Sequence, residues 1–360
     1  MLSNVKILCI FVFYLTTVVY PVMLCNELNQ LMIGIIGSGS WATAIVKILL
    51  EDPTREVDWW VRRDEVREAL ARDHRNPHHI PSTVLDMDRV RLTGDLATLV
   101  CECSHLVLAI PSAHIASVLS QLPKEAYAGK CFISAIKGAV PETSSMVSMY
   151  LEQELGVPVA NICVISGPTH AEEVSLERPT FLAVASLNAN LAGNVERMLS
   201  CSYLHTVRTD DVLGVELAGL MKNIYAIGAG LCQGVGYGDN MTAVYVTAAY
   251  GELQIVAHNV APNQHHDMAL YCYLGDLMVT CWSEHSRNRR LGYLLGQGLP
   301  VEEAFKQIGI VPEGYYSARI VHQYTDALLQ RLPLAEAVYR VLYEGSTAQN
   351  EMERVVKFYL

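Results

Sequence analysis

Short apolar runs alternate with helical stretches through more than half of this 360-residue chain. Runs of five or six mostly apolar residues, typical of buried strands, occur at Ile33–Gly37, Val57–Val61, His105–Ile110, Cys131–Ile136, Ile162–Ser166 and Phe181–Ser186. Strands separated by helices usually pair in parallel, with the helices covering both faces of the sheet. The alternation therefore predicts an α/β domain built on a doubly wound parallel sheet.

The strand pattern stops near Thr209, and long helical stretches follow it to the end of the chain. A chain of 39.8 kDa also exceeds the usual size of one domain. We therefore predict a nucleotide-binding domain over residues 32–208 and an all-helical C-terminal domain over residues 209–360. Because no linker rich in Pro, Gly or Ser separates them, the two domains should pack directly with a cleft between them.

Composition excludes some classes of function. The formal charge of −11 argues against a nucleic-acid partner, because phosphate backbones are bound by clustered Lys and Arg. The ten cysteines include no CxxC pair and no His spacing typical of a zinc site, so we expect no metal. Several, such as Cys131 and Cys163, lie in apolar runs and should be buried free thiols in a reducing compartment.

A glycine-rich turn follows the first predicted strand. The segment GSGSWA at residues 37–42 matches the pattern G-x-G-x-x-A, and a helix is expected to begin near Thr43. Gly37 permits the tight turn, Gly39 lets the backbone approach a pyrophosphate, and Ala42 allows close packing of the helix. The free N–H groups of the helix N-terminus then face the anion. This arrangement predicts a Rossmann-like site for a dinucleotide.

The end of the second predicted strand bears on the choice of dinucleotide. NAD-specific domains usually place an acidic residue there to bind the ribose 2′-hydroxyl. This chain has Arg62 and Arg63 instead. Two cations suit a 2′-phosphate, so the sequence favours NADPH over NADH. The alternative is an exposed basic pair with no ligand.

The uncharged stretch Ile7–Asn26 near the start of the chain has three interpretations. Its length fits a membrane anchor or the apolar part of a signal peptide. It also fits translated sequence upstream of a start at Met32, which we favour because Ile33 opens the first buried strand immediately. A nicotinamide enzyme also needs its intracellular cofactor pool, so we expect a cytoplasmic protein and leave the role of residues 1–31 open.

Lys222 is the only charge between Leu217 and Val235. A lysine in an apolar helix is costly to bury unless it is paired or its pKa is depressed, and a depressed pKa is what a general base needs. Lys137 and the segment GPTHA at 167–171 each close a predicted strand, at the sheet edge where ligands gather. Oxidation of a secondary alcohol requires a base and a cation near the developing alkoxide, roles that Lys222 and Lys137 can fill.

The segment SRNRR at residues 286–290 is typical of a helix start with a Ser cap. Free N–H groups and arginine at such a start can bind a phosphate. Phosphate binding away from the reacting carbon would position that carbon for hydride transfer.

Together these motifs resemble the bacterial-type NAD(P)-dependent glycerol-3-phosphate dehydrogenase family. The matching segments, in order, are GSGSWATA at 37–44, IKG at 136–138, GPTHAEEV at 167–174, GVELAGLMKNIYAIGAG at 214–230, GDN at 238–240, LGDLMVTC at 274–281 and SRNRRLG at 286–292. The chain departs from the family at three places. Ala42 stands where Gly is frequent, Thr169 where Ser is frequent, and Ala248–Tyr250 where an Arg-containing run is usual. None of these positions carries a catalytic role in the family.

The resemblance implies interconversion of sn-glycerol 3-phosphate and dihydroxyacetone phosphate, which supplies glycerol 3-phosphate for phospholipid synthesis, by a homodimer. It implies Lys222 as the proton acceptor. The implied substrate-binding residues are Lys137, Gly167, Thr169, Lys222, Asp276, Ser286, Arg287 and Asn288. Together with the turn glycines Gly37 and Gly39, the residues expected to bind the cofactor are Ser40, Trp41, Arg62, Arg63, Lys137, Ala171, Arg287, Val311 and Glu313.

Two alternatives remain at this point. A related NADP-dependent hydroxyacid or sugar dehydrogenase would share the architecture but should lack the SRNRR phosphate site. A redox-inactive NADPH-binding sensor should lack the lysine base, which this chain has at Lys222.

Overall fold

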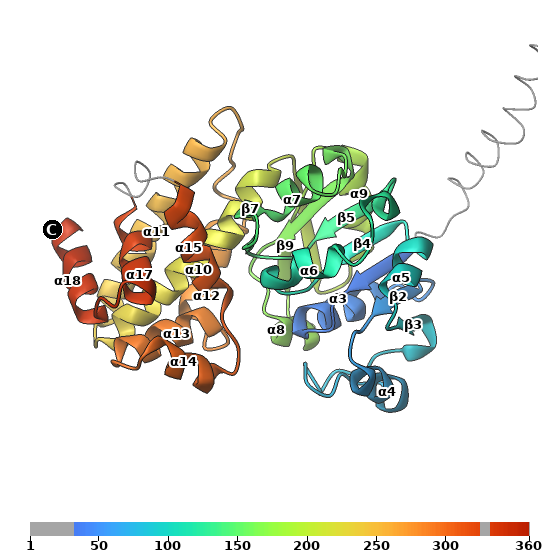
Figure 1. The fold of residues 1–360 in the computed structure, drawn as a ribbon, viewed down its shortest axis with the longest axis horizontal. Coiled ribbons are helices and arrows are strands. Elements are labelled where there is room, and N and C mark those ends of the chain that lie inside the picture. Colours follow the sequence, from blue (N-terminus) through green and yellow to red (C-terminus); the bar gives the residue numbers. More distant parts are fainter. Residues whose placement is uncertain (1–31, 325–331, 360) are drawn as a thin grey trace, which may run out of the picture.

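The computed structural model describes residues 32–324 and 332–359. The expectations for residues 1–31 fall outside this range. The described chain forms two lobes that lie side by side, one built on a sheet and one entirely helical (Figure 1). The predicted fold class, an α/β region followed by an all-helical region, is confirmed.

The sheet of the first lobe has eight strands in the order β10-β9-β8-β5-β4-β1-β2-β3. Its first six strands in the chain follow the doubly wound order of dinucleotide-binding folds, with the strand order reversing between β1 and β4. The strands are β1 Ile33–Ile36, β2 Val57–Trp60, β3 Val90–Thr93, β4 His105–Leu108, β5 Cys131–Ser134, β8 Ile162–Ser166, β9 Thr180–Ala185 and β10 Leu204–Thr209.

The expectation of an all-parallel sheet is wrong at one edge. β9 runs antiparallel to β8, and β10 runs parallel to β9, so these two strands oppose the other six. A parallel connection needs a helix long enough to carry the chain back along the sheet, whereas the link from β8 to β9 holds only the five-residue helix α8 Ala171–Ser175. The sequence prediction also missed β3, β10 and the two-residue hairpin strands β6 Ala139–Val140 and β7 Ser145–Met146.

Helices cover both faces of the sheet, as the alternation predicts. Successive residues of β1 point to opposite faces, so Ile35 packs in one core cluster and Ile36 in the other. The first cluster includes α3 Ser40–Leu50, α4 Asp64–Asp73, α8 and α9 Ala189–Leu199. The second includes α5 Leu96–Glu102, α6 Ile115–Leu119 and α7 Val147–Gln153.

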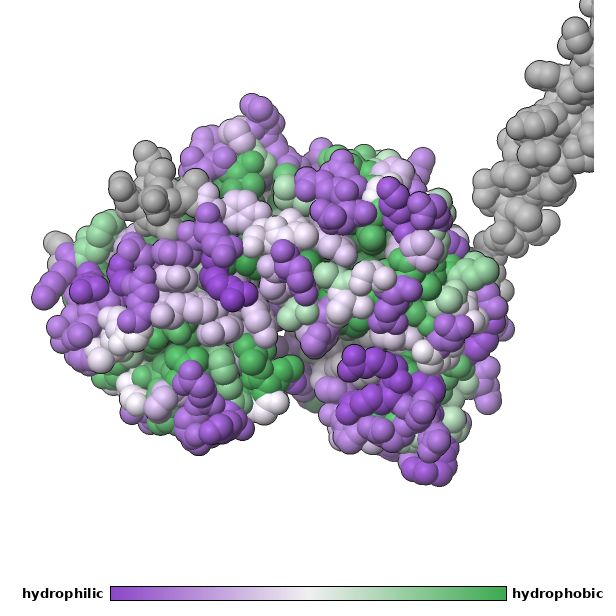
Figure 2. All heavy atoms as spheres, in the orientation of Figure 1, coloured by the Kyte–Doolittle hydropathy of each residue, from purple (hydrophilic) through white to green (hydrophobic). Residues whose placement is uncertain are grey.

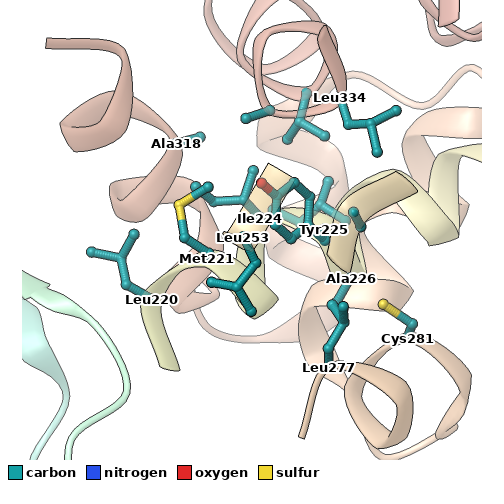
Figure 3. Packing of buried hydrophobic residues seen from close by; sticks show 14 of the residues in the cluster. Leu220, Met221, Ile224, Tyr225, Ala226, Leu253, Leu277, Cys281, Ala318 and Leu334 are labelled. Carbon is teal, nitrogen blue, oxygen red and sulfur yellow. The ribbon is translucent and has the colours of Figure 1, made fainter. Parts of the chain in front are cut away.

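All described elements after β10 are helices packed around α10 Val212–Gly234. Figure 3 shows its apolar side chains, including Leu220, Ile224 and Tyr225, packed against neighbouring helices. Among the described residues α10 alone is long and apolar enough to span a membrane, but 94% of its apolar window is buried inside the protein. The helices that pack on it are α11 Asp239–Val260, α12 Leu274–Trp282, α13 Arg287–Gly296, α15 Glu313–Tyr324, α17 Pro333–Tyr343 and α18 Ala348–Tyr359, and α14 Val301–Ile308 packs on α13.

Candidate active site

A cavity of about 560 Å³ lies between the two lobes. In the space-filling view a notch separates the lobes along one side (Figure 2). The wall of the cavity on the sheet side consists of the glycine turn, the ends of several strands and α8. The wall on the helical side consists of α10, α12, α13 and the start of α15. The site therefore requires both lobes.

The glycine turn lies at the point where the strand order reverses. Gly37 has φ +126°, and a Cβ there would lie 2.3 Å from the carbonyl oxygen of Ala109, so only glycine fits. Trp59 Nε1 donates a hydrogen bond to Gly37 O at 2.6 Å and fixes the turn from below. The helix begins at Ser40 rather than near Thr43 as expected, because Gly39 already has the extended geometry of an N-cap.

The residues of this turn fit a nucleotide pyrophosphate. Gly39 has open space where a Cβ would lie, and no side chain caps the N-terminus of the eleven-residue helix α3. The first turn of α3 also lacks acidic residues that would repel an anion. Trp41 Nε1 is buried and has no hydrogen-bond partner within the described chain, which leaves a donor for a ligand.

Arg62 and Arg63 follow β2 and line the same cavity. Both residues are exposed, and the nearest carboxylate to Arg63 is Glu65 at 3.7 Å. The backbone below them is held by Arg67, whose guanidinium donates to the carbonyl oxygens of Val61 and Arg62. The two guanidiniums are thus displayed toward solvent at the cavity edge, where an anion could reach them.

Lys222 and Lys137 share one buried carboxylate. Lys222 Nζ donates to Asp276 Oδ1 at 2.5 Å, and Lys137 Nζ donates to Asp276 Oδ2 at 2.9 Å. Lys222 Nζ also donates to Thr280 Oγ1 at 3.0 Å, while that hydroxyl donates to the Asp276 carbonyl oxygen at 2.6 Å. Lys137 Nζ makes two more bonds, to Gly167 O and Thr169 Oγ1. Both side chains therefore have fixed positions on the cavity wall.

Burial and mutual contact change the pKa values of Lys222 and Asp276. It lowers the pKa of Lys222 to about 7, an effect that Asp276 opposes and Lys137 reinforces. Burial would raise the pKa of Asp276, but the two lysines outweigh it and hold that pKa below its ordinary value. Asp276 therefore stays ionised, while the Lys222 amine can exist with or without its proton near neutral pH.

The helix predicted to begin after Ser286 is present as α13. Ser286 is its N-cap, and its hydroxyl accepts a hydrogen bond from the Arg289 backbone N–H. Arg287 lines the cavity and forms no ion pair within the described ranges. Asn288 lies on the same wall, but its amide binds protein groups: it donates to Asn223 Oδ1 and accepts from Gly314 N, both at 2.9 Å. Asn288 thus also fixes α13 against α10 and α15.

With one exception, the structure brings the site residues predicted from sequence to the wall of this cavity. Gly167 lies behind the wall, with its carbonyl oxygen 2.6 Å from Lys137 Nζ. Val311 and Glu313 line the cavity at the start of α15. The Glu313 carboxylate accepts hydrogen bonds from Ser112 N and Ser112 Oγ, so it also joins the two lobes.

The site residues predicted from sequence leave out several polar residues of the cavity, among them Thr280, Asn223 and His170. Thr280 lies four residues after Asp276 on α12, a spacing that places both side chains on one helix face and could have identified it. Asn223 follows Lys222 and donates to the carbonyl oxygen of Lys137 at 2.6 Å. No sequence signal distinguished His170 within GPTHA. In the described part of the chain no group of three or more His, Cys, Asp or Glu could hold a metal ion.

Comparison with known proteins agrees with this geometry. A family model described as the NAD-dependent glycerol-3-phosphate dehydrogenase N-terminus matches residues 32–192, and one described as the C-terminus of the same family matches residues 211–353. A glycerol-3-phosphate dehydrogenase (NAD(P)+) of Oceanobacillus iheyensis is 33% identical over 327 residues, covering 90% of this chain and 93% of its own. The enzyme of the same name from Syntrophomonas wolfei is 35% identical over 328 residues, covering 90% and 94%.

Solved structures extend the comparison. The crystal structure of glycerol-3-phosphate dehydrogenase from Coxiella burnetii matches with a TM-score of 0.81 and 29% identity, covering 90% of this chain and 98% of its own. Fold, cavity and family match together define a two-lobed dehydrogenase that uses a nicotinamide nucleotide. More closely, the chain belongs to the NAD-dependent glycerol-3-phosphate dehydrogenase family.

Proposed function

We propose that this enzyme interconverts sn-glycerol 3-phosphate and dihydroxyacetone phosphate, with Lys222 as the group that removes or returns the C2 hydroxyl proton. The observation that carries the proposal is the buried Lys222–Asp276–Lys137 cluster on the wall of a cavity that also holds a dinucleotide turn and a helix N-terminus. The nicotinamide ring of the bound cofactor supplies the chemistry of accepting or donating a hydride at C2.

The hydrogen bonds of Lys222 explain how a lysine can act as a base here. A neutral amine has two N–H groups and one lone pair. Asp276 and Thr280 accept the two N–H groups, because the Thr280 hydroxyl proton is already engaged with the Asp276 carbonyl oxygen. The lone pair is then the remaining valence, available to the C2 hydroxyl. In the reverse direction the ammonium has one further N–H to return to the C2 oxygen.

Lys137 supplies the fixed positive charge near the reacting oxygen. Its three N–H groups are directed to Asp276, Thr169 and Gly167, which keeps it an oriented cation and not a mobile base. An oriented cation stabilises the alkoxide character that develops at C2 as the hydride leaves. The N-terminus of α13 and Arg287 would bind the phosphate, so that the substrate is held at its non-reacting end.

The phosphate is the feature that separates this function from that of a dehydrogenase of hydroxyacids or unphosphorylated sugars. We expect the enzyme to oxidise NADPH with dihydroxyacetone phosphate and to be nearly inactive with dihydroxyacetone, measured by the loss of absorbance of the reduced cofactor. Equal kcat/KM for the two substrates would rule out the proposed phosphate site. A protein that binds NADPH but turns over neither substrate would be the redox-inactive alternative.

Arg62 and Arg63 support a preference for NADPH, because two exposed guanidiniums at the end of β2 suit a 2′-phosphate. Changing both to Ser should raise KM for NADPH about tenfold or more and leave KM for NADH nearly unchanged, since the loss of even one charge-assisted bond costs about 1.5–3 kcal/mol. Arg72→Ser is the matched control, because Arg72 is exposed on α4 and outside the cavity. Equal effects on both cofactors would show that the two arginines do not bind the 2′-phosphate.

A homodimer and a cytoplasmic location complete the proposal. All eight described cysteines are free, which agrees with a reducing compartment. Exposed apolar side chains on α12, namely Leu274, Met278 and Trp282, lie on one face of the helix and could pack against a second subunit.

A further inference from the structure

His170 lies between a residue of the proposed substrate site and a residue of the proposed cofactor site, Thr169 and Ala171. It occupies the N-cap position of α8 with extended backbone geometry, but its side chain forms no capping hydrogen bond. Its ring instead contributes to the cavity wall. The imidazole of His285, from the opposite lobe, packs against it with ring centroids 5.7 Å apart. His170 is thus held at the junction of the two lobes.

The Nε2 atom of His170 is buried and has no hydrogen-bond partner within the described residues. This contrasts with the lysines beside it, whose N–H groups are directed to oxygen atoms of the protein. A buried polar atom without a partner is costly, and in a ligand site such an atom commonly pairs with the ligand. Besides the open valence of Lys222, the geometry therefore leaves His170 Nε2 for an incoming group.

Burial and the charges around His170 favour the neutral form of its ring. Burial lowers its pKa, Lys222 and Lys137 lower that pKa further, and Glu173 and Glu172 oppose the shift. The His285 ring also packs against it. A neutral imidazole has one nitrogen that donates and one that accepts. It suits a neutral hydroxyl better than it suits a phosphate, which prefers a cation.

Dihydroxyacetone phosphate offers three polar groups to the cavity. In the proposed function Arg287 and the N-terminus of α13 bind the phosphate. Lys222 exchanges a proton with the C2 oxygen, and the charge of Lys137 lies nearby. The C1 hydroxyl has no partner in this arrangement. We propose that His170 Nε2 forms a hydrogen bond with the C1 hydroxyl of the substrate and so determines the preference for a substrate that carries it. The inference rests on the proposed function. Because a hydroxyl both donates and accepts, it holds for either tautomer of His170.

Hydroxyacetone phosphate, which lacks only the C1 hydroxyl, gives a direct test. The wild-type enzyme should have a kcat/KM for dihydroxyacetone phosphate roughly tenfold above that for hydroxyacetone phosphate, the size expected for one hydrogen bond in a site built for it. His170→Phe keeps the ring and its packing but removes the nitrogen. We expect it to lower kcat/KM for dihydroxyacetone phosphate roughly tenfold, to leave kcat/KM for hydroxyacetone phosphate nearly unchanged, and so to abolish the preference.

Two further variants distinguish a hydrogen bond of His170 from a purely structural role. His170→Gln places an amide nitrogen near the position of Nε2 and should restore part of the preference, which a purely structural role would not do. His285→Phe changes the neighbouring ring but not His170 and should keep the preference. A wild-type enzyme without the preference, or equal losses on both substrates in His170→Phe and His170→Gln, would overturn the assignment. Absence of any wild-type turnover of dihydroxyacetone phosphate would instead contradict the proposed function itself.

Discussion

At the scale of single residues, the state of the Lys222 amine is set by opposing influences. Burial and the nearby Lys137 favour the neutral amine, whereas Asp276 favours the ammonium. The balance brings the pKa of Lys222 to about 7. A base is most effective when its pKa lies near the working pH, because it can then both accept and release the proton. The same amine can therefore serve both directions of the reaction.

This balance predicts opposite pH dependences for the two directions. Oxidation of glycerol 3-phosphate needs the neutral amine, which predominates above the lowered pKa of Lys222, so kcat/KM should rise through about pH 7. Reduction of dihydroxyacetone phosphate needs the ammonium, so its kcat/KM should fall over the same range. Ionisation of the substrate phosphate affects both directions alike and cannot produce the reversal. Initial rates in both directions, measured from roughly pH 5.5 to 9 so that the range brackets the pKa of Lys222, would check this prediction. Parallel pH profiles in the two directions would contradict it.

The identities of the site residues could be predicted from sequence, but their pairings could not. The motifs indicated Lys222, Lys137 and Asp276 separately. That one carboxylate joins both lysines depends on a contact between Asp276 and a residue 139 positions away, which periodicity does not encode. For the same reason the resemblance implied Asn288 only as a substrate-binding residue, whereas its amide also binds Asn223 and Gly314.

At the scale of elements, the contact between α10 and α13 positions the chemistry. The two helices approach so closely that a Cβ on Gly292 would lie 1.8 Å from the carbonyl oxygen of Ile227. A Cβ on Gly230 of α10 would likewise lie 2.0 Å from the carbonyl oxygen of Arg289. Lys222 and the N-terminus of α13, the proposed phosphate site, belong to these two helices, so their separation is fixed by backbone contact.

Gly292→Ala should therefore be severely destabilising. The added methyl group meets backbone and not a flexible side chain, so the helices must move apart, at a cost of about 1–3 kcal/mol or more in the free energy of unfolding. Gly251→Ala in α11 is the control: a Cβ there has open space, and alanine should stabilise the helix by about 0.5–1 kcal/mol. Urea unfolding of both variants would check this. Equal stabilities would mean that the close approach is not required.

The elements that sequence analysis missed have physical reasons. β3 and β10 lie at the two edges of the sheet and include exposed positions, so neither presents the continuous apolar run of a central strand. The direction of β9 was wrong because strand direction depends on the length of the connecting helix, which an apolar pattern does not specify. By contrast, the central strands were predicted to within a few residues because they are buried on both faces.

At the scale of the whole molecule, the active site exists only where the two lobes meet. The sheet lobe contributes the dinucleotide turn and Lys137, and the helical lobe contributes Lys222, Asp276 and Arg287. Ion pairs and hydrogen bonds cross the junction, from Lys137 to Asp276 and from Ser112 to Glu313. Neither lobe alone therefore holds a complete active site.

The most direct measurement compares Lys222→Met with Arg287→Ala in NADPH oxidation by dihydroxyacetone phosphate. Methionine preserves much of the buried packing but cannot transfer a proton, so kcat should fall about 10²–10⁴-fold or more while KM and NADPH binding change little. Arg287→Ala should mainly raise KM for dihydroxyacetone phosphate. Removal of a general base lowers kcat by at least about 10²-fold. If Lys222→Met kept more than about a tenth of the wild-type kcat, Lys222 would therefore not be the proton-transferring group.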